Sequence, residues 1–363
     1  MVPNCIFNPY LDFYYDQNLL PSLNDEILLK IDQMNKSCNE DNKISHVLNL
    51  EKTRLAFNQL IFSKKKIKVL VDPGHLGGQY ATLEKRIFYL DSIKKSYLAE
   101  GDLTLRVFQE LKKISENNSK IQLINSRDMD DIGLAINEII EKDLIEDAWG
   151  RLIESNYYKN ILKPLESDKN NYLKFNYAFK LHAFNHYFSF LILKNRILKN
   201  NIYDPDLLIS IHFNAGEKEK LFLVSMIKGN IPTKRLYNDF WRFRLIRDSY
   251  QHQEFYSSYF LAQRINKNLS KMLELPYADS NFYEDHLSIE DSDNGYVGVD
   301  SWNGILFRYT DYPSVLIEGP HYDDPDFSKI LYNDLKLEIG DEKSIFYQYA
   351  KAIYDGLLEN PVQ

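Results

Sequence analysis

Apolar and polar positions alternate with two different periods between residues 64 and 125, and these periods separate strands from a helix. The apolar run after the lysines at 64–66 predicts a strand that ends at Asp72. Residues 100–115 have a helical period and begin with acidic residues, which favour a helix start. The apolar face of this helix consists of Leu103, Val107, Leu111 and Ile114. The apolar segment 121–125 follows, so the order predicts a parallel strand–helix–strand unit.

The same alternation continues in the second half of the chain. It predicts strands over 206–214, 221–230 and 314–318, and helices over 257–275 and 344–360. The stretch from about 276 to 300 is acidic and rich in turn residues, and we expect an irregular connection there. Together these elements predict an α/β fold: an open, mostly parallel sheet flanked by helices, with helical insertions and an N-terminal helical extension.

Two regions stand outside the strand–helix order. Residues 1–63 are predicted to form a largely helical extension, and residues 64–363 the main domain. Within that domain, residues from about 130 to 200 have a helical, aromatic pattern and form an insertion between two predicted strands. A segment this apolar must pack on something. It is predicted to be either a fixed helical subdomain on one side of the sheet or a lid over the edge from which it emerges.

Composition narrows the class of protein. The 363 residues carry 44 Lys and Arg against 52 Asp and Glu, a formal net charge of −8, which argues against a nucleic-acid binder. No stretch approaches the roughly 18 apolar residues that span a bilayer, so no membrane span is predicted. No signal peptide is visible, so we expect a protein that acts where it is made or a mature exported form. Cys5 and Cys38 are too few for a Cys-rich metal site, so a metal would use His, Asp or Glu.

Three predicted strands end in residues that titrate or bind metals: His75, His212 and Glu318. The carboxyl ends of the strands form the ligand-binding edge of an open α/β sheet, so we expect the three side chains to converge. The helix that begins at Glu100 brings another carboxylate toward this edge. Two imidazoles and a carboxylate are ligands of catalytic zinc, with water in the fourth position, and a further carboxylate can serve as general base. Singly, each residue has a structural explanation, and their coincidence favours a functional one.

Four short motifs contain these residues. They are Asp72-Pro73-Gly74-His75-Leu76-Gly77, the helix start at Glu100, Ser210-Ile211-His212-Phe213-Asn214-Ala215, and Pro313-Ser314-Val315-Leu316-Ile317-Glu318. In residue types and in order, they resemble the motifs of the zinc-dependent N-acetylmuramoyl-L-alanine amidases, the family often called amidase type 3. The resemblance covers about 67–127 and 200–358, and it leaves out the extension and the aromatic insertion.

The resemblance implies one Zn²⁺ ion held by His75, Glu100 and His212, with Glu318 as the catalytic base. It implies hydrolysis of the amide between N-acetylmuramic acid and L-alanine of peptidoglycan, in the periplasm or cell envelope, with a protein activator as an open possibility. Glu84 is an alternative third ligand, because it follows His75 by 9 residues whereas Glu100 follows it by 25. Glu100 is preferred because the helix after it has the family's apolar pattern. Asp72, three residues before His75, is expected to support a ligand or to be structural rather than to bind the metal itself.

Two alternative functions stay open. A catalytically idle peptidoglycan-binding module would share the fold, and a zinc carboxypeptidase would share the metal chemistry. The carboxypeptidases pair their first histidine with a Glu three residues later, where this chain has Gly78. Among other candidates, His182 and His186 have a metal-binding spacing, but their aromatic helix favours packing. Residues 290–295 are interpreted as a solvated turn rather than a calcium loop, and His321 as a loop histidine.

Overall fold

The structure of the chain is a computed structural model. It describes residues 64, 66–78, 80–91, 95–127, 196, 203–216, 221–228, 253–279, 287–291, 295–302, 307, 310 and 312–358. The predicted extension over 1–63, the aromatic insertion except for position 196, and the pair His182 and His186 lie outside these residues. Within the described ranges, no helix has the length and apolar character that crossing a bilayer requires.

The centre of the fold is a seven-stranded sheet with the strand order β4-β1-β5-β9-β6-β8-β7. Its strands are β1 (Ile67–Pro73), β4 (Ile121–Asn125), β5 (Leu207–Phe213), β6 (Val224–Lys228), β7 (Leu287–Asp291), β8 (Gly295–Trp302) and β9 (Ser314–Gly319). β1 pairs in parallel with β4 and β5, β5 with β9, and β6 with β8. The β6–β9 and β7–β8 pairs are antiparallel. The predicted open, mostly parallel sheet is therefore confirmed.

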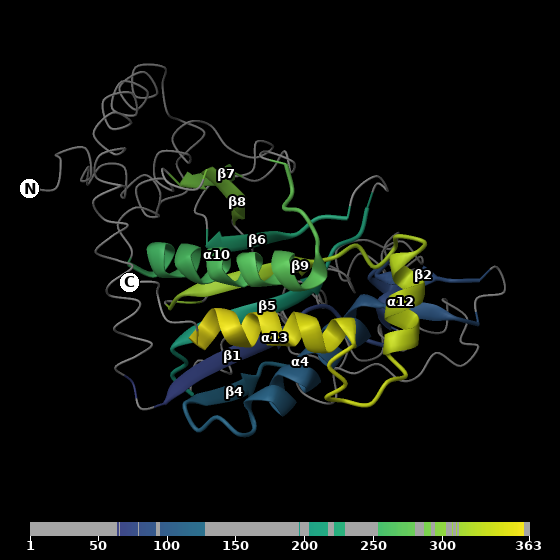
Figure 1. Ribbon diagram of the computed structural model, residues 1–363, viewed down its shortest axis with the longest axis horizontal. Coiled ribbons are helices and arrows are strands. Elements are labelled where there is room, and N and C mark those ends of the chain that lie inside the picture. Colours follow the sequence, from purple (N-terminus) through teal and green to yellow (C-terminus); the bar gives the residue numbers. More distant parts are fainter. Residues whose placement is uncertain are drawn as a thin grey trace, which may run out of the picture.

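Three long helices cover one face of this sheet: α4 (Glu100–Ser115), α10 (Gln253–Leu273) and α13 (Ile345–Leu358) (Figure 1). Two shorter helices, α3 (Tyr80–Leu83) and α12 (Phe327–Asp334), are not part of this three-helix layer. α4 occupies the predicted residues because its apolar positions repeat with a helical period and face the sheet. The helices and one side of the strands form the main core.

Side chains alternate between the two faces of each strand, and this alternation decides what faces the helices. Val71 of β1, Ile211 of β5 and Ile317 of β9 belong to the core beneath the helices. Leu70, Leu208 and Leu316 from the same strands form a second cluster with Met226 and Phe307. By the same alternation, Asp72, Ser210 and His212 lie on the face of the sheet turned away from the three helices. Full burial of each apolar side chain in these two clusters contributes about 1.5–3 kcal/mol to the stability of the fold.

The prediction of an irregular connection over 276–300 is wrong, because β7 and most of β8 lie there. The acidic residues give this stretch the composition of a loop rather than of strands. The two strands are stabilised by pairing: β8 pairs in parallel with β6, and β7 pairs with β8 in antiparallel fashion. Strand formation depends on neighbouring strands and packing more than on intrinsic preference, so the local composition led to the wrong prediction. Of the turn interpreted at 290–295, positions 290, 291 and 295 belong to these two strands, and 292–294 lie outside the described residues.

A two-stranded hairpin separates His75 from Glu100. Its strands are β2 (Ile87–Tyr89) and β3 (Tyr97–Ala99), and they are antiparallel. The hairpin lies beside α12, away from the seven-stranded sheet (Figure 1). β3 leads directly into α4, so the hairpin sets the position of the residue at which that helix begins.

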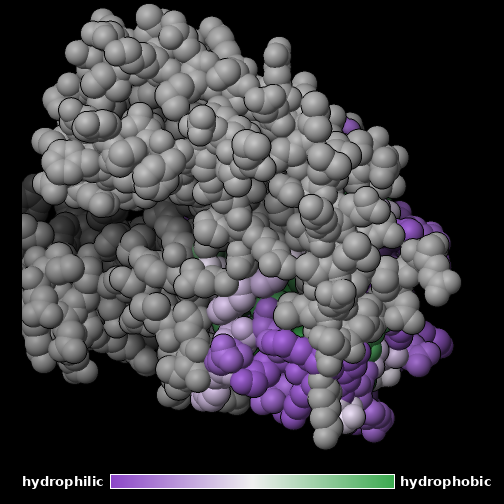
Figure 2. All heavy atoms as spheres, turned by 90° about the vertical axis from the view of Figure 1, so that its left-hand side faces the viewer, coloured by the Kyte–Doolittle hydropathy of each residue, from purple (hydrophilic) through white to green (hydrophobic). Residues whose placement is uncertain are grey.

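The described surface has few apolar features. Figure 2 shows one side of the molecule, on which the described residues are mostly hydrophilic and green atoms appear as small patches. Among the described residues, the large hydrophobic side chains that are exposed are Tyr203, Ile330 and Ile339. Scattered exposed side chains of this kind are normal on a globular protein and indicate no docking face.

Candidate metal centre

His75 lies in the turn that follows β1, and hydrogen bonds fasten this turn on both sides. The Gly74 amide donates to the carbonyl of Ile211 in β5 (2.8 Å), and the Thr104 hydroxyl of α4 donates to the carbonyl of Gly74 (2.8 Å). His75 itself has φ 59°, in the left-handed region, which is uncommon for a residue with a side chain. The turn therefore holds the imidazole at the carboxyl edge of the sheet in a backbone conformation that the surrounding contacts maintain.

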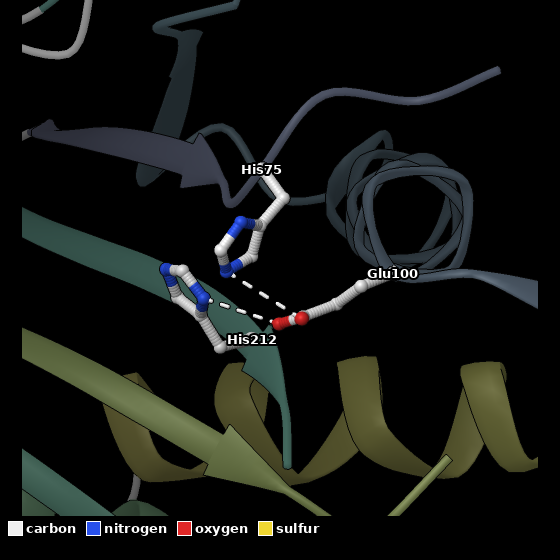
Figure 3. A group of neighbouring side chains, drawn as sticks. All are labelled: His75, Glu100 and His212. Atoms are coloured by element: carbon white, nitrogen blue, oxygen red, sulfur yellow. Dashed lines mark hydrogen bonds and ion pairs between the residues drawn. The ribbon is translucent and has the colours of Figure 1, made fainter. Parts of the chain in front are cut away.

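Glu100, the first residue of α4, connects the two histidines. One of its oxygens, Oε1, accepts a hydrogen bond from the Phe213 amide (3.1 Å) and lies 3.3 Å from Nδ1 of His212. The other, Oε2, lies 3.5 Å from Nε2 of His75. The three side chains come from three different elements and point toward one another (Figure 3). The two imidazole rings meet edge to face, with their centroids 4.9 Å apart.

His75, Glu100 and His212 form a group that could hold a metal ion, since their ligand atoms all lie within 4.8 Å of one another. Two imidazole nitrogens and one carboxylate oxygen are a donor set that suits zinc. Oε2 of Glu100 is buried and accepts no hydrogen bond from the described residues. Buried polar atoms are seldom left in this state, so an atom aimed at His75 without a donor fits a bound cation. The structure thus brings together the three residues that the sequence indicated.

The pKa shifts of Glu100 and His212 are consistent with a group that binds a metal ion. Burial by itself would raise the pKa of Glu100, but the charge of His75 and the hydrogen bond and charge of His212 outweigh it and lower the pKa from 4.5 to about 2. Burial would lower the pKa of His212, and the hydrogen bond with Glu100 and the charge of Glu318 raise it instead. Glu100 is therefore a carboxylate that cationic neighbours stabilise, as a metal ion would.

Glu318 adjoins this group from β9. It pairs with His212 in the parallel β5–β9 register, so the two side chains stand on the same face of the sheet. Burial raises the pKa of Glu318, and the charge of Glu100 also raises it, while the charge of His212 opposes them. Glu318 consequently binds a proton more readily than an ordinary carboxylate. A raised pKa of this kind is what a general base near neutral pH requires.

Glu84, the alternative third ligand, approaches His75 from the other side of the ring. Its Oε2 lies 3.7 Å from Nδ1 of His75 and accepts a hydrogen bond from the Leu76 amide (2.8 Å). Burial would raise the pKa of Glu84, but its contacts with His75 and Leu76 lower it. The structure places Glu84 behind one imidazole, whereas Glu100 faces both. A carboxylate behind a histidine is the arrangement that orients metal-binding imidazoles.

Asp72 is held within the sheet rather than at the metal-binding group. It is 1% exposed, and it accepts hydrogen bonds from the hydroxyls of Ser126 and Ser210, the latter at 3.1 Å. The guanidinium of Arg196 lies 3.7 Å from the same carboxylate. These contacts match the structural role predicted for Asp72. Arg196 is the described residue of the insertion over 130–200, so this point of the insertion lies against the sheet.

Sequence reasoning missed two residues near the group. Arg86 approaches Glu100 from the hairpin, with its NH1 nitrogen 3.6 Å from Oε2. Tyr322 follows β9 and is buried, and burial and the charge of Glu100 raise the pKa of its phenol. The available signals were weak: a basic residue before a strand-like segment, and an aromatic residue four positions after Glu318. His321 is also buried, but it contacts Phe222 and Asp323 and does not join the group, as expected for a loop histidine.

Gly74 has no space for a side chain, because the ring of His212 fills the position. A Cβ atom on Gly74 would lie 2.7 Å from Nδ1 of His212 and closer still to other ring atoms. We expect Gly74→Ala to tilt this imidazole and to weaken zinc binding by about 10–100-fold, the size of other changes to the support of a metal ligand. Competition with a chromogenic chelator measures this affinity. Unchanged affinity in a variant that keeps its circular dichroism spectrum and Tm would contradict the proposed contact.

The fold and the group together define a class: an open α/β sheet with a candidate catalytic metal centre at the carboxyl edge of its strands. The sequence profile described as N-acetylmuramoyl-L-alanine amidase matches residues 69–358, which is most of the chain. The chain therefore belongs to the N-acetylmuramoyl-L-alanine amidase family. This membership gives its enzyme class and confirms the resemblance found in the sequence.

Solved structures of several amidases are similar to the chain at low identity. An N-acetylmuramoyl-L-alanine amidase from Clostridium difficile 630 is 15% identical, with 81% of this chain and 96% of that chain covered and a TM-score of 0.40. Ami1 from Mycobacterium smegmatis is 14% identical, with 80% and 95% covered and a TM-score of 0.42. The CwlD amidase from Clostridioides difficile, in complex with the GerS lipoprotein, is 17% identical, with 81% and 98% covered and a TM-score of 0.40. No curated protein sequence matches the chain.

Proposed function

We propose that this protein is a zinc-dependent hydrolase of the amide bond between N-acetylmuramic acid and L-alanine in peptidoglycan. One Zn²⁺ ion would be held by His75, Glu100 and His212, and Glu318 would be the general base. The observation that carries the proposal is the convergence of the first three side chains within 4.8 Å, with Glu318 on the neighbouring strand in register with His212. The family to which the chain belongs supplies the substrate class.

The bound ion would supply a Lewis acid for the scissile carbonyl and would lower the pKa of a water molecule. The chain's own residues then move the proton. Glu318 accepts it from the attacking water and delivers it to the departing amine of L-alanine. The raised pKa of Glu318, which burial causes, suits both steps because the carboxylate must bind a proton and then release it. The products are a lactyl carboxyl group and a peptide with a free amino terminus.

Other residues orient the metal ligands in this proposal. Glu84 faces Nδ1 of His75 and favours the tautomer that carries its proton there, which leaves Nε2 free on the side of Glu100. The Phe213 amide holds Oε1 of Glu100 by a hydrogen bond. Because backbone groups and a buried carboxylate supply these contacts, the ligands are arranged before an ion binds. Such preorganisation favours tight binding of zinc.

The proposed place of action is the periplasm or cell envelope, where peptidoglycan is found. The direct test is release of dye from labelled peptidoglycan by the purified protein loaded with zinc, without any added protein. Dye release supports the proposal and shows that no activator is required. Absence of release by a folded protein that retains stoichiometric zinc, also after cell-envelope extract is added, would favour the idle binding module. Release only with the extract would indicate a protein activator.

A further inference from the structure

The hairpin between His75 and Glu100 places an arginine at the candidate metal centre. The β2–β3 register pairs Ile87 with Ala99, so the next pair toward the open end is Arg86 and Glu100. Two backbone hydrogen bonds fix this position: the Glu100 amide donates to the carbonyl of Arg86 (3.0 Å), and the Arg86 amide donates to the carbonyl of Ala81 (2.8 Å). The long spacing between His75 and Glu100 thus has a structural consequence, since the extra residues bring Arg86 to the group.

The guanidinium of Arg86 lies at the entrance of the group rather than inside it. Its side chain is 40% exposed, whereas that of Glu100 is 1% exposed. The 3.6 Å between its NH1 nitrogen and Oε2 of Glu100 is an ion-pair distance and too long for a hydrogen bond. The guanidinium donates no hydrogen bond to any residue in the described part of the chain. Its donors are therefore available to a molecule that enters from solvent.

Charge balance favours a role for Arg86 when a divalent ion is bound. Three carboxylates surround the candidate centre, from Glu84, Glu100 and Glu318. With neutral imidazoles, a divalent ion and the guanidinium together neutralise these three negative charges. An arginine guanidinium stays protonated in proteins, so Arg86 carries a positive charge at this position. The extra positive charge is thus accommodated beside the ion, at a point open to substrate.

We propose that Arg86 is a further catalytic residue, which donates hydrogen bonds to the oxygen of the scissile carbonyl as it becomes negatively charged. This inference rests on the proposed function. When the water oxygen bonds to the carbonyl carbon, the electron pair of the C=O π bond moves to the oxygen, and the guanidinium stabilises that charge without giving up a proton. The pair then re-forms the C=O bond, the C–N bond breaks, and the amine takes the proton held by Glu318. Removal of one such donor typically costs about 10²–10³-fold in kcat.

Arg86→Ala and Arg86→Lys on a soluble muropeptide test this role, with Lys85→Ala as the matched control. Lys85 is the exposed neighbour of Arg86, so its removal takes away the same charge without touching the centre. We expect Arg86→Ala to lower kcat by about 10²–10³-fold with KM changed by less than about threefold, and Arg86→Lys to recover part of the loss. Lys85→Ala should retain the wild-type values.

Two binding measurements separate this role from its alternatives. A phosphinate that replaces the scissile amide carries a tetrahedral anion, and its affinity for zinc-loaded protein should fall in Arg86→Ala in proportion to kcat. Zinc affinity, measured by chelator competition, should change little. A raised KM with unchanged kcat would show a contact with a substrate carboxylate instead, and a weakened zinc affinity with unchanged kcat at full zinc loading would show that Arg86 only neutralises Glu100. Either result overturns the inference.

Wild-type turnover distinguishes failure of this inference from failure of the proposed function. If the zinc-loaded wild type does not hydrolyse the muropeptide, also after cell-envelope extract is added, the proposed function itself is contradicted. If the wild type is active and Arg86→Ala retains its kcat and its affinity for the phosphinate, only the role of Arg86 is contradicted.

Discussion

Glu318→Gln should abolish most turnover while leaving zinc in place. We expect kcat on a soluble muropeptide to fall by about 10²–10⁴-fold, the usual contribution of a general base. The amide has nearly the shape of the carboxylate, and Glu318 stands beside the metal-binding group without belonging to it. The variant should therefore fold and retain stoichiometric zinc. It loses only the ability to take a proton from water and pass it to the leaving amine.

The control for this experiment is Glu338→Gln, which makes the same change at an exposed position between α12 and α13. Zinc content by atomic absorption, Tm and kcat should be measured on both variants and on the wild type. Retention of wild-type kcat by Glu318→Gln would remove Glu318 from the mechanism. Loss of zinc in this variant would instead make Glu318 a ligand, and the division of roles proposed here would then be wrong.

His75→Ala and His212→Ala should each lose stoichiometric zinc, and activity with it. The three proposed ligands come from a turn, a helix start and a strand, so none can be replaced by a neighbour when one is removed. Glu100→Gln should also weaken zinc binding strongly, because its carboxylate is the group that faces both imidazoles. An amide oxygen carries no negative charge to offset that of the ion.

Glu84→Gln is the matched comparison for Glu100→Gln. Glu84 contacts the far side of His75, so its loss should cost at most about 10–100-fold in zinc affinity, as for other groups that support a ligand. Stoichiometric zinc should remain at saturating metal. Equilibrium dialysis with atomic absorption measures both variants. If Glu84→Gln lost its zinc and Glu100→Gln kept it, the assignment of the third ligand would be reversed.

The parts of the fold that the sequence predicted are those in which a strong local pattern agrees with the tertiary structure. The strand before Asp72 and the helix that begins at Glu100 have clear periods, and both are found at the expected residues. β7 and β8 were not predicted, because their residues are acidic and turn-rich and their stability comes from pairing of β8 with β6 and of β7 with β8. Pairing between distant segments leaves little trace in local sequence.

The candidate site shows the same division. His75, His212 and Glu318 could be predicted because each lies at or just after the carboxyl end of a strand, and these ends meet at one edge of a parallel sheet. Arg86 could not, because its approach to Glu100 depends on the β2–β3 register rather than on a motif. Arg196 reaches Asp72 from a segment whose path the sequence pattern does not define. Whether that segment is a lid or a fixed subdomain stays a prediction, since it lies outside the described residues apart from Arg196.

A mass spectrum of the products from purified peptidoglycan tests the central claim most directly, because it identifies the bond that is cleaved. The zinc-loaded wild type should yield glycan strands with a free lactyl carboxyl group on N-acetylmuramic acid, and stem peptides that begin with the free amino group of L-alanine. Glu318→Gln treated in the same way should yield neither product. Stem peptides shortened from their carboxyl ends, or muropeptides left intact by a folded protein with full zinc even in the presence of cell-envelope extract, would contradict the account.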